Sequence, residues 1–149
     1  MTDLGTTADR AAIDDLVRRF FAAFTNKDDA APNVDDLTAL FMPSGVIVKA
    51  VGVETEVYSV QSFIVPRRRI LADGTLRDFS EEETDARTDI AGNIAQRISL
   101  YRKSGVMAGE RFEAKGIKVM QFVRMPNGWR ISAVSWDDER EGLTIPGAL

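Results

Sequence analysis

The C-terminal part of the chain constrains the fold most strongly. Two long segments, FEAKGIKVMQFVRM and GWRISAVSWDD, are separated only by Pro126 and Asn127 before Gly128. Alternating β-type segments joined by so short a Pro-Asn-Gly connection predict a long β-hairpin. In a strand, successive side chains point to opposite faces of the sheet, and here both faces carry apolar residues. A sheet that is apolar on both faces has to be covered on both.

The two covers are expected to differ. Helical patterns upstream can cover one face of the sheet, and a second copy of the chain is the natural cover for the other. We therefore expect a homodimer that forms through the outer face of the sheet. We also expect the 149 residues to form a single domain, 1–149, with a core from about residue 8 to residue 139 and short tails.

Composition excludes several classes of function. The chain has no Cys and no His, which excludes thiolate catalysis, Ser-His-Asp triads and the usual zinc sites. We expect no metal and no cofactor. A net charge of −4 argues against a nucleic-acid partner, and no apolar run is long enough to suggest a membrane partner. The N-terminal residues lack the order of a signal peptide, so we expect a cytoplasmic location.

The upstream pattern predicts three helices. Apolar residues recur at helical spacing from a cap at Thr7 or Asp9 to about Asn26, then from Val34 to Phe41, and from about Ser59 to Ala72. Val46 to Lys49 is expected to be a short strand, with a second extended piece from Gly52 to Tyr58. Four long strands follow and are expected to be antiparallel. The basic run Arg67-Arg68-Arg69 is interpreted as a solvated helix face or partner contact.

This order resembles the nuclear transport factor 2-like superfamily, which includes polyketide cyclases and ketosteroid isomerases. The resemblance rests on RRFFAAFTNKD, LTALFMPSGVIV, GNIAQRISLYRKSG and QFVRMPNGWRISAVSWDDE. It implies an α+β fold: a curved, largely antiparallel sheet with three N-terminal helices packed on its concave face, in a cone-shaped α+β barrel that encloses a pocket. It also implies that the outer sheet face often forms a dimer.

The resemblance places Phe20, Lys49 and Gln121 where a ketosteroid isomerase has its oxyanion-hole tyrosine, its general base and its protonated aspartate. None of the three can perform that role, so the chain is not expected to be a ketosteroid isomerase. Scytalone dehydratases and most cyclases also need a histidine, which the chain lacks.

The same resemblance implies which side chains face the pocket. The expected ligand-binding residues are Arg97, Tyr101, Gln121, Ser135 and Lys49. Met120, Phe122, Val134 and Trp136 are then assigned to the dimer face. Each ligand-binding candidate has a structural alternative: Arg97 could equally pair with the acidic strand near Glu83 and Asp85, and Tyr101 could be a packed aromatic residue.

Three functions remain open from the sequence. The first is a dimeric small-molecule-binding protein, for which Arg97 favours an anionic or carboxylate-bearing ligand. The second is a lyase, isomerase or cyclase that uses Asp137 as a base, with Tyr101 and Arg97 stabilising developing charge. The third is an assembly or adaptor module without catalysis.

Overall fold

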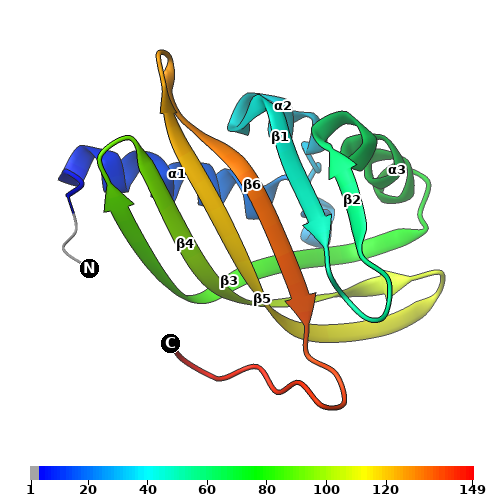
Figure 1. The fold of residues 1–149 in the computed structure, drawn as a ribbon. Helices are drawn as coiled ribbons and strands as arrows, with labels where there is room; N and C mark the ends of the chain where they lie inside the picture. Colours follow the sequence, from blue (N-terminus) through cyan, green and yellow to red (C-terminus); the bar gives the residue numbers. More distant parts are fainter. Residues whose placement is uncertain (1–3) are drawn as a thin grey trace.

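The structure is a computed structural model that describes residues 4–149. Three helices and six strands follow one another in the expected order. The helices are α1 (Thr7–Ala22), α2 (Leu37–Leu40) and α3 (Val60–Ala72), and the strands are β1 (Phe41–Lys49), β2 (Glu56–Ser59), β3 (Leu76–Ala91), β4 (Ile94–Met107), β5 (Glu110–Met125) and β6 (Gly128–Asp138). The helices lie behind the curved sheet in Figure 1. The predicted α+β class is confirmed.

The six strands form one open sheet in the order β2-β1-β6-β5-β4-β3. The four long strands are antiparallel neighbours, as expected, whereas β1 pairs with β6 in parallel. The sheet curls around the helices, but its edge strands β2 and β3 are not neighbours in the sheet. The sheet is therefore curled but not closed into a barrel. No helix within residues 4–149 is both long enough and apolar enough to cross a membrane.

Helix α1 is held at both ends by side chains. Thr6, rather than Thr7 or Asp9, is the N-cap, and Thr6 and Asp9 form a reciprocal capping box. Trp129 Nε1 also donates a hydrogen bond to Asp9 at 3.0 Å, which fastens the helix to the β5–β6 hairpin. The helix ends at Ala22, earlier than predicted, because Asn26 bonds instead to the backbone of β3 at Leu76 and Phe79.

The segment predicted as a helix from Val34 to Phe41 is shorter in the structure. A 3-10 turn at Val34–Asp36 leads into the four residues of α2, and Phe41 already begins β1. Residues 42–45, between the expected helix and the expected strand, form an irregularity within β1, where its register with β6 shifts. Pro43 and Gly45 therefore lie in an irregular part of a strand.

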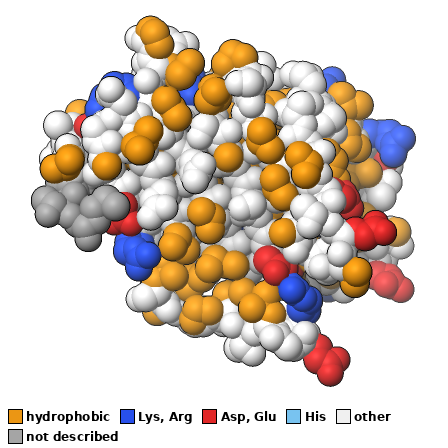
Figure 2. Space-filling model, in the orientation of Figure 1, with side chains coloured by type: hydrophobic (Ala, Val, Ile, Leu, Met, Phe, Trp, Pro, Cys, Tyr) orange, Lys and Arg blue, Asp and Glu red, His pale blue; other side chains and the backbone are white. Residues whose placement is uncertain are grey.

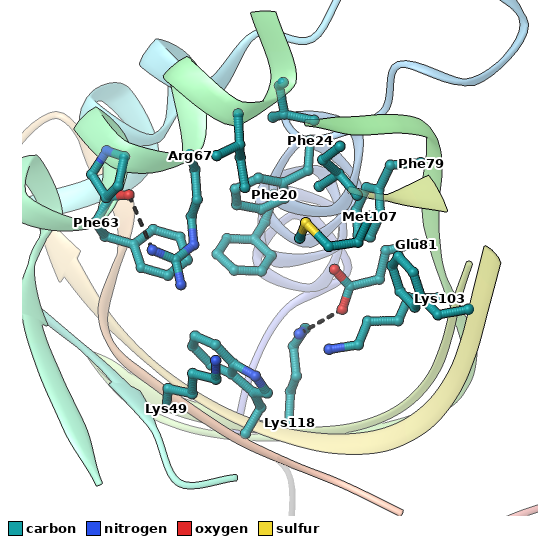
Figure 3. A pocket seen from close by; sticks show the side chains of 16 residues that line it. Phe20, Phe24, Lys49, Phe63, Arg67, Phe79, Glu81, Lys103, Met107 and Lys118 are labelled. Carbon is teal, nitrogen blue, oxygen red and sulfur yellow. Dashed lines mark hydrogen bonds and ion pairs between the residues drawn. The ribbon is translucent and has the colours of Figure 1, made fainter. Parts of the chain in front are cut away.

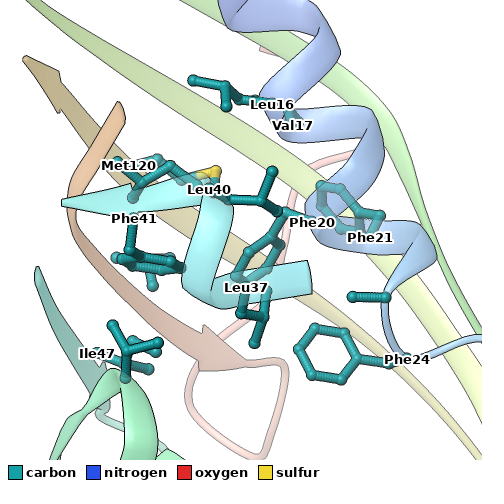
Figure 4. Close-up of a cluster of buried hydrophobic side chains, with 14 of the residues drawn as sticks. Leu16, Val17, Phe20, Phe21, Phe24, Leu37, Leu40, Phe41, Ile47 and Met120 are labelled. Atoms are coloured by element: carbon teal, nitrogen blue, oxygen red, sulfur yellow. The ribbon is translucent and has the colours of Figure 1, made fainter. Parts of the chain in front are cut away.

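The main core lies between α1, α2 and the concave face of the sheet (Figure 4). Phe20 packs edge-on against Phe24 and Phe21, with ring centroids 5.6 and 5.9 Å apart. From the sheet, Met120 and Ile47 complete this cluster, and both are fully buried. The same buried cluster continues under α3 through Phe63, Ile64 and Trp136.

The face assignment of the last two strands is reversed relative to the sequence prediction. Met120, Phe122, Val134 and Trp136 are buried on the concave face, whereas Gln121 is exposed and Val119 is 38% exposed on the outer face. A register shift between β5 and β6 at Gln121 and Phe122 lets Ile131 and Val134 both point inward. Parity could not settle the faces because both are apolar and the strand contains a bulge.

The C-terminal residues after β6 cross one end of the outer face. Ile145 is buried, and Leu100, which points outward from β4, is only 1% exposed. Ile145, Pro146 and Leu100 line the same small hollow. The backbone N–H of Leu149 donates to Asp85 on β3 at 2.8 Å. The predicted tail therefore packs on the sheet.

Candidate functional site

A cavity with a volume of about 370 Å³, called the main cavity below, opens beneath α3. Figure 3 shows α1, α3 and the concave face of the sheet enclosing it. Its walls are mostly apolar, and six aromatic residues contribute to them: Phe20, Phe24, Phe63, Phe79, Phe112 and Trp136. A cavity of this size with apolar walls is typical of small-molecule sites.

The charged residues of the cavity are mainly basic. Lys49, Lys103, Lys118 and Arg67 line it, and Glu81 is its one acidic residue among those described. Three of the five lysines of the chain therefore meet in a single cavity, although the protein as a whole carries a net charge of −4. The register of the sheet explains this, because Lys118 pairs with Trp136 on β6, and Trp136 pairs with Lys49 on β1.

Lys118 is the most unusual of these residues. Its side chain is 4% exposed, and its ammonium lies 2.6 Å from Oε1 of Glu81, which is 7% exposed. Lysine is almost never fully buried unless it is paired. Burial lowers the pKa of Lys118, while the charge of Glu81 opposes that change. Glu81 Oε1 accepts no regular hydrogen bond from the described residues. The ion pair with Lys118 is therefore the main interaction that offsets the cost of burying this carboxylate.

Aromatic rings surround the same ammonium. It lies 4.0 Å from the centre of the Tyr101 ring and 5.1 Å from that of Trp136, with Phe20 and Phe21 somewhat further away. A cation over an aromatic face is attracted by the ring quadrupole. The rings thus offset part of the cost of burying Lys118 without supplying a second hydrogen-bond acceptor.

Arg67 approaches the cavity from α3. Its guanidinium stacks on Phe63 at 3.5 Å from the ring centre and lies 5.1 Å from that of Tyr58. Desolvation by burial lowers its pKa. Arg68 and Arg69, by contrast, are exposed, so the prediction of a solvated basic face holds for two of these three residues.

Tyr101 lies in the floor beneath the cavity. Its hydroxyl donates to Asp138 and, at 3.3 Å, to the carbonyl of Asp137, while Asp138 also pairs with Lys103 at 3.0 Å. Burial raises the pKa of Tyr101, and the hydrogen bond to Asp138 adds to that rise. The ring crosses directly over Gly116, where a Cβ would lie 2.0 Å from the hydroxyl oxygen. Tyr101 is thus packed and bonded to the protein.

Arg97 is on the concave face but outside the main cavity. It donates to Glu83 at 3.1 Å, to Asp14 on α1 at 2.7 Å and to Thr88 at 3.0 Å. Ser99 donates to the same Glu83. The alternative interpretation of Arg97, as a partner of the acidic strand, is the one that the structure shows. Its donors are directed at protein acceptors.

The other expected site residues are separated from the cavity. Gln121 and Ser135 lie on the outer face, because Gln121 pairs with Ala133 and Ser135 pairs with Val119 on that side of the sheet. Asp137 also points outward and forms an ion pair with Arg140. Asp137, Arg97 and Tyr101 are therefore not brought together, and of the five expected ligand-binding residues only Lys49 lines the main cavity.

Sequence reasoning missed Lys118, Glu81, Lys103 and Arg67. The sequence did contain an indication for Lys118. Gly116, Lys118 and Met120 alternate along one face of the strand, and a lysine on that face is conspicuous once the face is known to point inward. Glu81 was hidden in an acidic run that resembles a solvated strand. Within residues 4–149, no group of three or more His, Cys, Asp or Glu residues is placed to hold a metal ion.

Comparison with known proteins supports the fold. No protein-family model matches the sequence, and no curated protein matches it. Among solved structures, the Kfla4162 protein from Kribbella flavida has a TM-score of 0.73 at 17% identity, covering 89% of this chain and 92% of that one. A nuclear transport factor 2-like superfamily protein from Salmonella enterica serovar Typhimurium has a TM-score of 0.72 at 16% identity, with the same two coverages.

A third solved structure describes the same architecture as a cystatin-like fold. A protein from Novosphingobium aromaticivorans, described as nuclear transport factor 2-like with a cystatin-like fold, has a TM-score of 0.66 at 18% identity. The match covers 87% of this chain and 81% of that one. Similarity at such low identity shows architecture alone, since this kind of fold carries many unrelated functions. The chain therefore has the nuclear transport factor 2-like, cystatin-like α+β fold that the resemblance implied.

Proposed function

We propose that this protein binds a small molecule with an apolar, preferably aromatic, body and an anionic group such as a carboxylate. The observation that carries the proposal is the cavity of about 370 Å³ in which Lys49, Lys103, Lys118 and Arg67 meet a single carboxylate, Glu81. Convergent polar groups on apolar walls are what a specific small-molecule site requires. Because basic groups outnumber acidic ones in the lining, the cavity favours a negatively charged ligand.

Lys49 and Lys103 are the groups best placed to meet that anion. No carboxylate of the described residues lies within ion-pair distance of Lys49, and Lys103 shares Asp138 with the hydroxyl of Tyr101. The charge of Lys118 is already compensated by its ion pair with Glu81, and the guanidinium of Arg67 stacks on Phe63. An incoming carboxylate would therefore gain most from Lys49 and Lys103, while the aromatic walls cover its apolar body.

The two alternative functions have less support. An enzyme built on Asp137, Arg97 and Tyr101 would need those side chains in mutual reach, and they point to different places. An adaptor would be favoured by a cone already filled with side chains, and this cone has an open cavity at one end.

The test compares two ligands that differ only in charge. Isothermal titration calorimetry with 2-naphthoate and with its neutral primary amide should show about tenfold or tighter binding of the anion, which corresponds to about 1.4 kcal/mol. The variants Lys49→Met and Lys103→Met should each remove much of that difference. Lys115→Met is the matched control, because Lys115 is exposed on the same strand as Lys118. Equal binding of acid and amide would overturn the proposal.

We further propose that the outer face of the sheet forms a homodimer. A row of residues crosses that face through Ile98, Val119, Ser135 and Val48, and Ile94 and Val46 beside it are 59% and 39% exposed. Figure 2 shows hydrophobic side chains across this face, with few charged groups in its middle. An apolar patch of this kind is typical of an interaction surface.

Light scattering distinguishes the two states. The unmodified protein should have the mass of a dimer at micromolar concentration, and Val119→Glu should give a monomer because it would bury two uncompensated carboxylates. Val53→Glu is the control, since Val53 is fully exposed in the β1–β2 connection and lies away from the row. A monomeric unmodified protein would refute this part of the proposal.

A further inference from the structure

Lys118 presents a primary amine to the cavity from a buried position. The ammonium nitrogen lies against the aromatic faces of Tyr101 and Trp136. Lys118 also lines the cavity, where Figure 3 shows its side chain directed toward Glu81. A lysine that served only to attract an anion would not need to be 96% buried, because long-range attraction also works from half-buried positions such as those of Lys49 and Lys103. Its burial against Tyr101 and Trp136 indicates a different use.

The surroundings of this amine favour its neutral form. Desolvation is the largest cause of its lowered pKa, and the neighbouring ammonium of Lys103 acts in the same direction. The carboxylate of Glu81 opposes both and does not outweigh them. Desolvated lysines beside another cation are those that act as amine nucleophiles, since only the neutral amine has a free electron pair.

Glu81 is placed to carry the proton that such chemistry moves. Its Oε1 is 2.6 Å from the amine nitrogen and accepts no regular hydrogen bond from the described residues. A carboxylate at that distance can take a proton from the ammonium and return it to a leaving hydroxyl. Glu81 also lines the cavity, so a bound ligand would be within its reach.

We propose that Lys118 forms a reversible imine with aldehyde or ketone ligands that enter this cavity. Glu81 takes a proton from the ammonium and leaves the neutral amine. The amine nitrogen attacks the carbonyl carbon, the C–N bond forms as the carbonyl π bond breaks, and a proton passes from the nitrogen to the carbonyl oxygen to give a carbinolamine. Glu81 then protonates that hydroxyl, the C–O bond breaks, and water leaves. The product is the iminium of Lys118, and hydrolysis reverses each step, so neither an oxidant nor a reductant is needed.

The preferred carbonyl compound rests in part on the proposed function. If Lys49 and Lys103 bind an anion, the best ligand carries a carboxylate several bonds away from its carbonyl, with an aromatic body between the two. The amine chemistry of Lys118 does not depend on that anion, because it requires only that a carbonyl compound enter the cavity.

Reductive trapping tests the inference directly. The protein is treated with 4-carboxybenzaldehyde or with benzaldehyde and cyanoborohydride, which converts an imine into a stable secondary amine, and the modified lysine is located by peptide mass spectrometry. We expect Lys118 to be trapped at least about tenfold faster than the exposed Lys27 and Lys115, because burial lowers the pKa of Lys118 and only the neutral amine attacks the carbonyl. Trapping at equal rates on all lysines, or none on Lys118, would overturn the inference.

Variants assign the roles of the two residues. Glu81→Gln should retain the trapped site but slow its formation about tenfold or more, because the amine loses its proton carrier. Lys115→Met should change nothing at Lys118. The peptide map of the unmodified protein already identifies the site, so the test remains decisive even if Lys118→Met does not fold. Unchanged trapping in Glu81→Gln would remove Glu81 from the mechanism.

The two aldehydes separate this inference from the proposed function. If both label Lys118 equally well, the amine chemistry holds and the preference for anions fails. If 2-naphthoate binds more tightly than its amide but neither aldehyde labels Lys118, the preference for anions holds and the imine is refuted. Faster labelling by the carboxylate-bearing aldehyde, abolished by Lys103→Met, would support both.

Discussion

Two ion pairs stand two residues apart on β3 and differ in almost every other respect. Glu83 pairs with Arg97 beneath α1, and Glu81 pairs with Lys118 at the open end of the cone. Arg97 has acceptors on Glu83, Asp14 and Thr88, whereas Lys118 has one carboxylate and a set of aromatic rings. The first pair lines a hollow between α1 and β3 in which Asp14 on α1 supplies a further acceptor, and the second faces the main cavity beneath α3.

The two pairs differ in the direction in which the pKa of the cation is shifted. Burial lowers the pKa of both cations, but at Arg97 the hydrogen bonds and charges of Glu83 and Asp14 outweigh burial, so that its pKa is raised. At Lys118 burial outweighs Glu81, and the pKa is lowered. A fully bonded pair of this kind fixes the packing of a helix on a sheet. An incompletely bonded pair beside a cavity leaves capacity for a ligand.

The largest expected effect comes from removing one member of the pair of Glu81 and Lys118. Lys118→Met should lower the free energy of unfolding by on the order of 3 kcal/mol, because it leaves Glu81 buried without a cation. The double variant Lys118→Met with Glu81→Leu should recover most of that loss, since it replaces a buried pair with apolar groups. Urea denaturation measures both. A double variant as unstable as the single one would show that Glu81 is not the source of the cost.

A smaller loss is expected at the pair of Glu83 and Arg97. Arg97→Met should lower the free energy of unfolding by about 2 kcal/mol, because charged hydrogen bonds are lost but water can still reach Asp14, whose side chain is 63% exposed. The affinity for 2-naphthoate should not change, since Arg97 lies outside the main cavity. Weaker naphthoate binding in this variant, with its fold intact, would place Arg97 in the ligand site and break the contrast between the two pairs.

The smallest effect is a difference in pH dependence. Between the lowered pKa of Lys118 and its ordinary value of 10.5, the unfolded chain holds a proton that the folded chain has lost, so this group makes stability rise with pH. The rise is at most about 1.4 kcal/mol per pH unit. Thermal unfolding measured from pH 7 to about pH 9.5 should show this rise in stability for the unmodified protein and no such rise for Lys118→Met.

The rise in stability with pH ends at alkaline pH because of Tyr101. Its pKa is raised by burial, so above its ordinary value of 10.0 the unfolded chain loses a proton that the folded chain keeps, and stability falls. Arg97→Met should retain the same rise as the unmodified protein. A rise of equal slope in Lys118→Met would assign the effect to another group.

Local patterns predicted much of the fold. The apolar stripe from Ile13 to Phe24 indicated α1, and the Pro126-Asn127 connection indicated the β5–β6 hairpin. The candidate site was predicted far less well, because it depended on parity in strands that are apolar on both faces. Lys118 would have been recognised only if the inward parity had been known, and a two-sided strand does not reveal it.

The sequence by itself determined the order of helices and strands, the absence of His and Cys chemistry, and a sheet with apolar residues on both faces. These follow from residue type and spacing along the chain, which act locally. Tertiary structure decided which face was the inner one. It also brought Lys49, Lys103 and Lys118 into one cavity from three different strands and paired Arg97 with Glu83 beneath α1. The physical reason is that register, bulges and helix packing are settled by competition among contacts distant in sequence, and no single segment carries that information.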